Sequence, residues 1–530
     1  MFRSSHFVMI VVSLFFSSFY NDLFWKKVAQ VYPFNGTNFW YFVSLFIILS
    51  SVIYIVLSLI NFKYILKPVL IILFMVTAAT SYFMNSYGIV IDSQMINNLF
   101  ETQVAEASDL VSVKLFVDLT IFGVIPSIVI YFLKIEYKSF GKHLLYKFLG
   151  IFIALLIIIA NLYVFSKFYT SFFREHKPLR YYTNPPYYIY SFGKYIHSKY
   201  QNQNIVVQKT GLDAKLVEGK KPKLLVLVVG ESARADHFSL NGYKRDTNPN
   251  LKKENVINFD KMYSCGTETA TSVPCMFSIL DRSDFSIKKA LEHENLLDVA
   301  KRAGVRIKWI DNNSDSKGVA TRIKDVVNIR GKKIEKFCDT GECRDEAMLV
   351  GLQKYIDSNI TDTIIVLHQM GNHGPAYYKR YPVKEFTKFK PVCKSNQLQE
   401  CSKESIINAY DNTILYTDYF LSKTIDILKK NQDKYDTAFL YLSDHGESLG
   451  EKGVYLHAMP YFIAPIAQRH IGAVAWFGDK FDHIDKACVR KIANKDYSQD
   501  NYFSTVLGLM GIKTKVYKKK QDIFAQCRKD

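Results

Sequence analysis

Residues able to bind a metal ion follow three apolar runs that lie between residues 223 and 444. Glu231 directly follows the first run, His373 lies a few residues after the second, and Asp444 and His445 follow the third. Another histidine, His457, comes soon afterwards. One polar residue at a strand end is more often a helix cap, but three such ends favour a common site. Carboxylates combined with imidazoles are typical of catalytic zinc sites with an open position.

The segment 264–275, SCGTETATSVPC, offers several hydroxyl groups that could serve as a nucleophile beside such a metal. A hydroxyl is a weak nucleophile at its ordinary pKa, and metal coordination lowers that pKa. Gly266 and Ala270 are small enough for the start of a helix, whose free N–H groups would favour a phosphate. Spacing alone also fits an ordinary turn rich in Ser and Thr.

The elements that must position these residues alternate along the chain from residue 223 onward. Short apolar runs, which we expect to be strands, are separated by stretches typical of helices. This alternation predicts an α/β fold with a mostly parallel central sheet, and the chemistry of such folds gathers at the carboxyl ends of the strands. The expected strands cover 223–231, 305–311, 363–368 and 437–444.

The first third of the chain is different, because it is apolar enough to enter a membrane. The 530 residues carry 68 Lys and Arg against 49 Asp and Glu, but the charged residues are sparse before residue 150. Long uncharged runs exclude a water-soluble protein. The first run lacks an A-x-A-like cleavage site, so we expect an uncleaved helix instead of a signal peptide. Five spans are predicted, at 4–21, 28–62, 68–91, 115–133 and 148–166.

The basic residues of the short loops predict the orientation of these spans, because Lys and Arg are retained in the cytoplasm. An N-terminus inside leaves seven basic residues on the inner side and three on the outer side. Five crossings then place residues 168–530 outside, where their net positive charge suits an anionic lipid surface. The segment 168–220 is rich in Tyr, Lys and Pro, which is typical of a linker at the membrane surface.

The cysteines agree with this placement, since all eight lie between residues 265 and 527. Close pairs in an extracytoplasmic domain predict disulfides, whereas a zinc site would need C-x2-C and His spacings that are missing. Cys488 and Cys527 could form a fourth bridge, for which spacing gives no guide. The close pairs are Cys265 with Cys275, Cys338 with Cys343, and Cys393 with Cys401.

Five longer motifs make the sequence more specific. They are GESARADH at 230–237, CGTETATSVPCMFS at 265–278, DNNSDSKG at 311–318, HQMGNHGP at 368–375 and SDHGESLG at 443–450. Together they resemble the lipid A phosphoethanolamine transferases, a family that includes the mobile colistin-resistance enzymes. The resemblance implies an α-helical membrane domain of five transmembrane helices at 1–167, with an outer loop at 89–113. It also implies a linker at 168–220 and a periplasmic catalytic domain of alkaline phosphatase and sulfatase type at 221–530.

The resemblance also assigns roles to individual residues. It implies that Thr269 is the nucleophile and that its oxygen completes a zinc site formed by Glu231, Asp444 and His445. A second zinc remains an open alternative. His373 and His457 would contact substrate phosphate or that second zinc, and either could transfer protons. Residues implied to contact the phosphatidylethanolamine donor are Ser314, Lys317, Asn98, Thr102 and Glu106, the last three on one stripe of a helix.

The implied reaction is a zinc-dependent double displacement through a phospho-threonine, from phosphatidylethanolamine to lipid A or another envelope acceptor. Such a product would favour polymyxin resistance, and the enzyme would be an inner-membrane monomer with no nucleic-acid partner. A sulfatase is disfavoured because the C-x-P-x-R motif is missing. A glycerol-phosphate transferase or a hydrolase of the same fold remains an alternative. A non-catalytic lipid-binding protein predicts a missing nucleophile or ligand, yet all are present.

Overall fold

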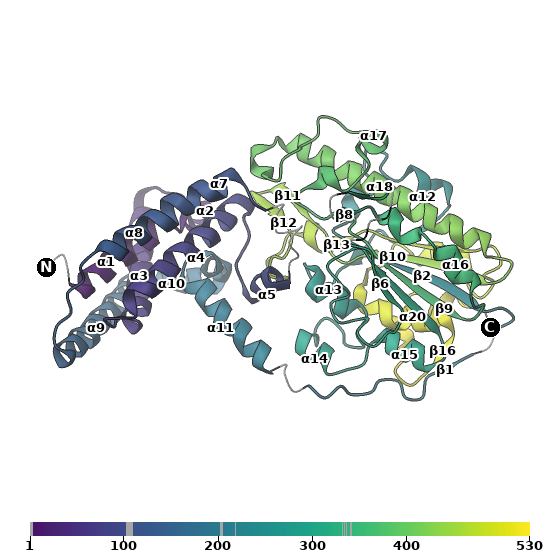
Figure 1. Ribbon diagram of the computed structural model, residues 1–530, viewed down its shortest axis with the longest axis horizontal. Coiled ribbons are helices and arrows are strands. Elements are labelled where there is room, and N and C mark those ends of the chain that lie inside the picture. The colour runs from purple at the N-terminus through teal and green to yellow at the C-terminus, as the bar shows by residue number, and fades with distance from the viewer. Residues whose placement is uncertain are drawn as a thin grey trace. The chain divides into compact units, whose positions relative to one another are not determined.

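The computed structural model describes residues 4–101, 110–201, 205–217, 219–330, 332, 334, 336–339 and 342–529. It divides into two compact units (Figure 1). The membrane unit comprises Met1–Phe100 with Val111–His197, and the catalytic unit comprises Glu101–Leu110 with Ser198–Asp530. Thr102 and Glu106 lie outside the described residues.

Long apolar helices form most of the membrane unit. Four are long enough to cross a membrane, at Asn38–Leu59, Leu66–Tyr87, Val113–Phe132 and Phe140–Val164. A fifth span is possible if two helices joined at a 59° bend count as one. The helices are α1 (Ser5–Phe19), α2 (Asp22–Val31), α3 (Gly36–Leu59), α4 (Leu66–Tyr87), α7 (Val113–Asp118), the π-helix η1 (Leu119–Val124), α8 (Ile125–Phe132) and α9 (Phe140–Val164).

Two predicted spans differ from the structure at their starts. The expected span 28–62 is divided, because α2 ends before Pro33 and α3 begins only at Gly36, a residue with φ 44°. Proline supplies no backbone N–H for a continuing helix, and glycine tolerates positive φ. The last span begins at Phe140 instead of residue 148, so its first turns carry Lys142 and Lys147. Long lysine side chains can extend their ammonium groups out of an apolar layer.

The tyrosine-rich region after α9 is largely helical. It forms α10 (Ser166–Glu175), the 3-10 helix η2 (Lys177–Tyr182) and α11 (Pro186–Gln201), and up to His197 it packs with the membrane unit. Asn184 donates its backbone N–H to Asn21 Oδ1 at 2.7 Å, and Asn21 Nδ2 donates back to the Asn184 carbonyl at 2.8 Å. This reciprocal pair fixes the region to the break between α1 and α2. The segment before α7 contains α5 (Ser93–Glu101).

A seven-stranded sheet organises the catalytic unit, in the order β3-β14-β10-β2-β9-β5-β6. β10, β2, β9, β5 and β6 run parallel, while β14 is antiparallel to both β10 and β3. The predicted α/β fold with a mostly parallel sheet is thereby confirmed. The strands are β3 (Ile257–Asn258), β14 (Ala473–Phe477), β10 (Asp436–Ser443), β2 (Lys223–Gly230), β9 (Thr363–His368), β5 (Arg306–Asp311) and β6 (Val326–Asn328).

Both faces of this sheet are covered, as buried parallel sheets require. All eight residues of β2 are buried, and successive residues alternate between two hydrophobic cores. One core packs against α15 (Leu296–Arg302) and α20 (Tyr502–Met510), the other against α18 (Lys403–Lys430) (Figure 1). The remaining helices are α12 (Pro249–Lys253), α13 (Thr269–Met276), α14 (Ile287–Leu291), α16 (Leu352–Asp357), α17 (Val383–Phe386) and α19 (Lys486–Ile492).

Short strands and disulfides secure the periphery of this unit. The three close cysteine pairs form the predicted disulfides, and Cys488 and Cys527 form the fourth. The small sheets pair β1 (Lys215–Leu216) with β16 (Ile512–Lys513), β7 (Cys338–Asp339) with β8 (Glu342–Cys343), β11 (Ser448–Glu451) with β12 (Val454–Leu456), and β4 (Met262–Tyr263) with β13 (His470–Ile471) and β15 (Tyr497–Ser498).

Candidate active site

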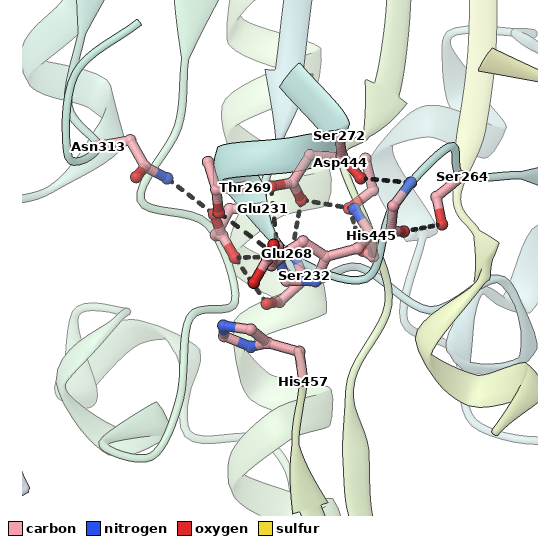
Figure 2. A network of polar contacts seen from close by, with 12 residues as sticks. Glu231, Ser232, Ser264, Glu268, Thr269, Ser272, Asn313, Asp444, His445 and His457 are labelled. Carbon is pink, nitrogen blue, oxygen red and sulfur yellow. Dashed lines mark hydrogen bonds and ion pairs between the residues drawn. The ribbon is translucent and has the colours of Figure 1, made fainter. Parts of the chain in front are cut away.

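The central strands of the sheet bring the predicted acidic residues together at their carboxyl ends. Gly230, the last residue of β2, pairs in register with Ser443, the last residue of β10. Glu231 and Asp444 are therefore neighbours, although 213 positions separate them in the numbering. Both side chains are fully buried, as is that of His445. Figure 2 shows these residues around the start of the short helix α13.

Thr269 is the first residue of α13 and points into this cluster. Its hydroxyl donates to Glu231 Oε2 at 3.0 Å and lies 3.4 Å from His445 Nε2. The other two threonines of the loop bond elsewhere, because Thr267 donates to the Met459 carbonyl and Thr271 donates to a side-chain oxygen of Glu268. Of these three hydroxyls, that of Thr269 is bonded to the acidic cluster.

The loop before α13 is tightly packed, which explains the small residue at its turn. A Cβ on Gly266 would lie 2.9 Å from side-chain atoms of Thr271 and Ser272, closer than real contacts allow. The backbone N–H of Gly266 donates to Ser272 Oγ at 3.0 Å. The Cys265–Cys275 disulfide closes the same loop around Thr269. Packing and cross-linking therefore hold the threonine in one position.

The donor atoms of the cluster fit a divalent metal ion. His445 Nδ1 lies 2.8 Å from the Gly446 carbonyl and donates to it, which leaves the lone pair of Nε2 facing the cluster. That nitrogen lies 3.4 Å from both Glu231 Oε1 and Asp444 Oδ2. Asp444 Oδ2 is buried and has no hydrogen-bond partner among the described residues. A buried carboxylate oxygen without a donor is costly, and a cation would compensate it.

The pKa shifts of the cluster also favour a bound cation. Burial, and then the charge of Glu231, raise the pKa of Asp444 well above its ordinary value. Burial alone would also raise the pKa of Glu231, but the positive charge that His445 and the other nearby imidazoles carry when protonated lowers it overall. Burial lowers the pKa of His445 to about 4, so its imidazole is neutral at physiological pH. Two closely spaced carboxyl groups beside a neutral imidazole form the donor set that zinc prefers.

Two further histidines lie beside the cluster. The ring of His457, which follows β12, lies 4.4 Å from that of His445 and 5.4 Å from that of His373. His457 Nδ1 lies 2.8 Å from Glu447 Oε2, and Tyr377 donates its hydroxyl to the other oxygen of Glu447 at 2.7 Å. Burial lowers the pKa of His457, but Glu447 outweighs that effect and raises it to about 9. Single ligand atoms of Glu231, His445 and His457 lie within 4.8 Å of one another. His457 is therefore a further potential ligand of the metal.

Two residues that the sequence did not single out support the cluster. Asn313 donates its amide to Glu231 Oε2 at 2.9 Å and to the Gln369 carbonyl at 2.7 Å. Glu447 orients His457, as described above. Both lie inside quoted motifs, DNNSDSKG and SDHGESLG, so motif membership was the available signal. Their roles depend on contacts between distant segments, which spacing does not reveal.

The remaining predicted donor-binding residues are only partly brought together. Ser314 lies next to the cluster, where its N–H and hydroxyl both bond to Asn313 Oδ1. Lys317 adopts φ 48°, and its Nζ donates to the Ser314 carbonyl at 3.3 Å. Asn98 lies on α5 in the membrane unit. The predicted stripe of Asn98, Thr102 and Glu106 stays a prediction, because its last two members fall outside the described residues.

Comparison with known proteins identifies the family. Residues 223–512 match the family described as Sulfatase, and residues 49–200 match that described as Phosphoethanolamine transferase EptA/EptB. The chain is 44% identical over 481 residues to phosphatidylethanolamine transferase Mcr-2 from Escherichia coli, covering 88% of this chain and 89% of that protein. It is 40% identical over 532 residues to phosphoethanolamine transferase EptA from E. coli K12, covering 98% and 96%. The chain belongs to the phosphoethanolamine transferase family.

The structure of this phosphoethanolamine transferase agrees with that assignment. It matches the integral membrane lipooligosaccharide phosphoethanolamine transferase A (EptA) of Neisseria meningitidis with a TM-score of 0.94 and 35% identity, over 98% of each chain. The resemblance stated from the five motifs is thereby confirmed. Although the catalytic unit matches the Sulfatase family, Cys275 is held in a disulfide with Cys265 and supplies no free thiol.

Proposed function

We propose that this transferase moves phosphoethanolamine from phosphatidylethanolamine to lipid A by double displacement, with Thr269 as the nucleophile. The observation that carries the proposal is the contrast among the three threonines of the loop. Thr267 and Thr271 bond to other groups, whereas the Thr269 hydroxyl lies against Glu231 and His445. A nucleophilic hydroxyl needs such an activating environment.

A zinc ion fits the same residues, with Glu231, Asp444, His445 and the Thr269 oxygen holding it. The unpartnered Asp444 Oδ2 and the lone pair of His445 Nε2 support this ligand set. When bound, the ion supplies positive charge beside the attacking oxygen, which favours loss of the hydroxyl proton. A second ion near His373 and His457 is an alternative, and the metal content of the purified enzyme would distinguish one ion from two.

In the first step, Thr269 Oγ1 attacks the phosphorus of the donor. A bond forms between phosphorus and the threonine oxygen, and the bond to the diacylglycerol oxygen breaks. Glu231 Oε2 accepts the threonine hydrogen bond and is placed to orient the attacking oxygen. The proton of the Thr269 hydroxyl passes to His373 or His457, the two candidate proton shuttles, and the same histidine gives a proton to the diacylglycerol oxygen. Ser314 and Lys317 are proposed to bind the donor head group.

In the second step, an oxygen of the acceptor attacks the same phosphorus, and the bond to Thr269 breaks. The proton of the acceptor passes through the same histidine to the Thr269 oxygen, so the hydroxyl is restored for another turnover. Because the product carries an added ammonium group, the envelope surface becomes less negative, and we propose that this favours polymyxin resistance. The catalytic unit is proposed to act in the periplasm, as a monomer in an inner-membrane protein with a cytoplasmic N-terminus and five spans.

Mass spectrometry of lipid A from cells with and without the gene tests this function directly. Phosphoethanolamine-modified lipid A should be present only when the intact enzyme is expressed. A glycerol-phosphate modification would instead support the alternative transferase of the same fold. Unmodified lipid A, together with ethanolamine phosphate released into solution by purified enzyme, would support a hydrolase.

A further inference from the structure

Two arginines of the catalytic unit converge on one tyrosine ring. The guanidinium carbon of Arg282 lies 3.3 Å from the centroid of the Tyr461 ring, and that of Arg469 lies 5.2 Å from it. All three residues are half-buried. Planar guanidinium groups stack favourably on aromatic rings, so the tyrosine holds two positive charges in one place.

Neither guanidinium forms an ion pair with another described residue. Within the described ranges, Arg282 and Arg469 form no ion pair and no side-chain hydrogen bond, and the Nε of each is buried and unpartnered. Arg234, by contrast, pairs with Asp236 at 2.7 Å and with Glu451 at 2.6 Å. Guanidinium donors that are withdrawn from water and left unbonded are unfavourable, and an anion would satisfy them.

Tyr461 and Arg469 contact the residue that precedes the loop of the nucleophile. Tyr461 donates its hydroxyl to the Ser264 carbonyl at 3.0 Å, and the Ser264 N–H donates to the Arg469 carbonyl at 2.8 Å. Ser264 directly precedes the disulfide loop that carries Thr269. The Ala458 N–H also donates to the Thr267 carbonyl at 2.7 Å, so the segment before Tyr461 runs along the same loop.

Two carboxylates, Asp281 and Asp500, lie near Arg282, and neither forms an ion pair with it; the charge of Arg282 acts on Asp500 from a distance. Asp281 accepts from Lys518 Nζ at 3.4 Å and from Gln521 Nε2 at 2.5 Å. Asp500 accepts the backbone N–H of Arg282 at 2.8 Å. The same surface segment also exposes apolar side chains, since Phe462 is 67% and Ile466 is 56% exposed. Positive charge beside exposed apolar groups suits a ligand that has both a phosphate and acyl chains.

We propose that Arg282 and Arg469 bind a phosphate group of the acceptor, which is a phosphorylated lipid. This inference rests on the proposed function, and it assigns the two arginines to the acceptor and not to the donor. A donor head group pairs its phosphate with an ammonium, so its site needs an available carboxylate as well as a cation. A phosphate monoester carries excess negative charge and matches two guanidinium groups that form no ion pair.

The test separates acceptor binding from the donor half-reaction in the full-length enzyme. Arg282→Gln and Arg469→Gln remove charge but keep polar side chains of similar length, and Arg→Lys at each position restores the charge. Arg490→Gln is the matched control, because Arg490 bonds to the Asn255 carbonyl and amide. The donor half-reaction is followed as diacylglycerol release from phosphatidylethanolamine, and the complete reaction as transfer to lipid A.

Each Gln variant should raise the KM for lipid A roughly tenfold or more, the size expected for a lost charge-assisted hydrogen bond. Diacylglycerol release should stay at the wild-type rate, and Lys should recover part of the loss. A parallel fall in diacylglycerol release would overturn the proposal by assigning the arginines to the donor, and an unchanged KM would overturn it outright. Wild-type enzyme that releases no diacylglycerol would refute the proposed function instead.

A second measurement tests the proposal without using the arginine variants, so it does not depend on whether they fold. Full-length Thr269→Ala protein should bind lipid A at least tenfold more tightly than lipid A from which the phosphate groups have been removed. Inorganic phosphate should compete with lipid A in the complete reaction of the wild type, without slowing diacylglycerol release. Equal affinity for the two forms of lipid A would refute the proposal.

Discussion

Replacing Thr269 by alanine should abolish transfer while leaving the fold intact. The substitution removes one hydroxyl, which donates to Glu231 Oε2 at 3.0 Å. Glu231 keeps two other donors, Ser232 Oγ at 2.7 Å and Asn313 Nδ2 at 2.9 Å. Loss of one of three hydrogen bonds to a carboxylate costs about 1.5 to 3 kcal/mol at most, so the melting temperature should fall by only a few degrees.

The effect on the rate should be far larger than the effect on stability. Thr269 supplies the hydroxyl that bonds to the acidic cluster, whereas Thr267 is bonded to the Met459 carbonyl and Thr271 to Glu268. Removal of a covalent nucleophile lowers turnover by roughly 1,000-fold or more in enzymes of known mechanism. Thr269→Ser should keep measurable activity, because it retains the oxygen.

The assay uses intact enzyme with phosphatidylethanolamine and no acceptor, followed by digestion and peptide mass measurement. Wild-type protein should carry phosphoethanolamine on the peptide that contains Thr269, and fragmentation should place it on that residue. Thr267→Ala and Thr271→Ala are the matched controls and should both form the adduct. An adduct on Thr267 or Thr271, or full transfer by Thr269→Ala, would refute the assignment.

Three further predictions concern the metal, a disulfide and a buried carboxyl group. Removal of divalent metal by a chelator should stop diacylglycerol release and lower the melting temperature, and added zinc should restore both. Replacing Cys265 and Cys275 together by serine should cost about 2 to 3 kcal/mol of stability, and transfer should fall more than after the same change at Cys338 and Cys343. Burial raises the pKa of Asp418 from 3.8 to about 6, despite hydrogen bonds from Asn250 and Leu251. The Asp418 carboxyl therefore favours the folded state most below pH 4, and this contribution is lost as the pH rises through 6. Between pH 4 and 7, the free energy of unfolding of Asp418→Asn should rise relative to that of the wild type by up to about 3 kcal/mol. Melting curves of both proteins at each pH measure this difference.

The parts of the site that were predictable from sequence are those encoded locally. A run of apolar residues ending in a carboxylate specifies a buried strand and the group at its tip, as for β2 with Glu231 and β10 with Asp444. Because parallel strands expose their carboxyl ends at one edge, the two carboxylates had to be neighbours. The disulfides between close cysteine pairs were also predictable, since a short loop brings both sulfur atoms within bonding distance.

The parts that were not predictable depend on contacts between distant segments. Residues 166–201 contain many aromatic residues and two adjacent prolines, a composition typical of a linker, yet α10 and α11 form there. Tertiary packing overrides weak local preference in such segments. Asn313 likewise gains its role only when its strand-end loop meets Glu231, and Glu447 gains its role only when β11 and β12 bring it to His457.

This site is costly for the fold, because charged and polar groups are buried together in it. Glu231, Asp444 and His445 are fully buried, and Ser232 beside them adopts φ 55°, a conformation unfavourable for a residue with a side chain. Such a cluster is held together only where surrounding structure fixes it, and here two hydrophobic cores enclose the strands that carry it. The unpartnered oxygen of Asp444 is not compensated by those cores. Metal binding should therefore stabilise the catalytic unit as well as activate Thr269, because the ion would offset repulsion that the folded chain otherwise retains.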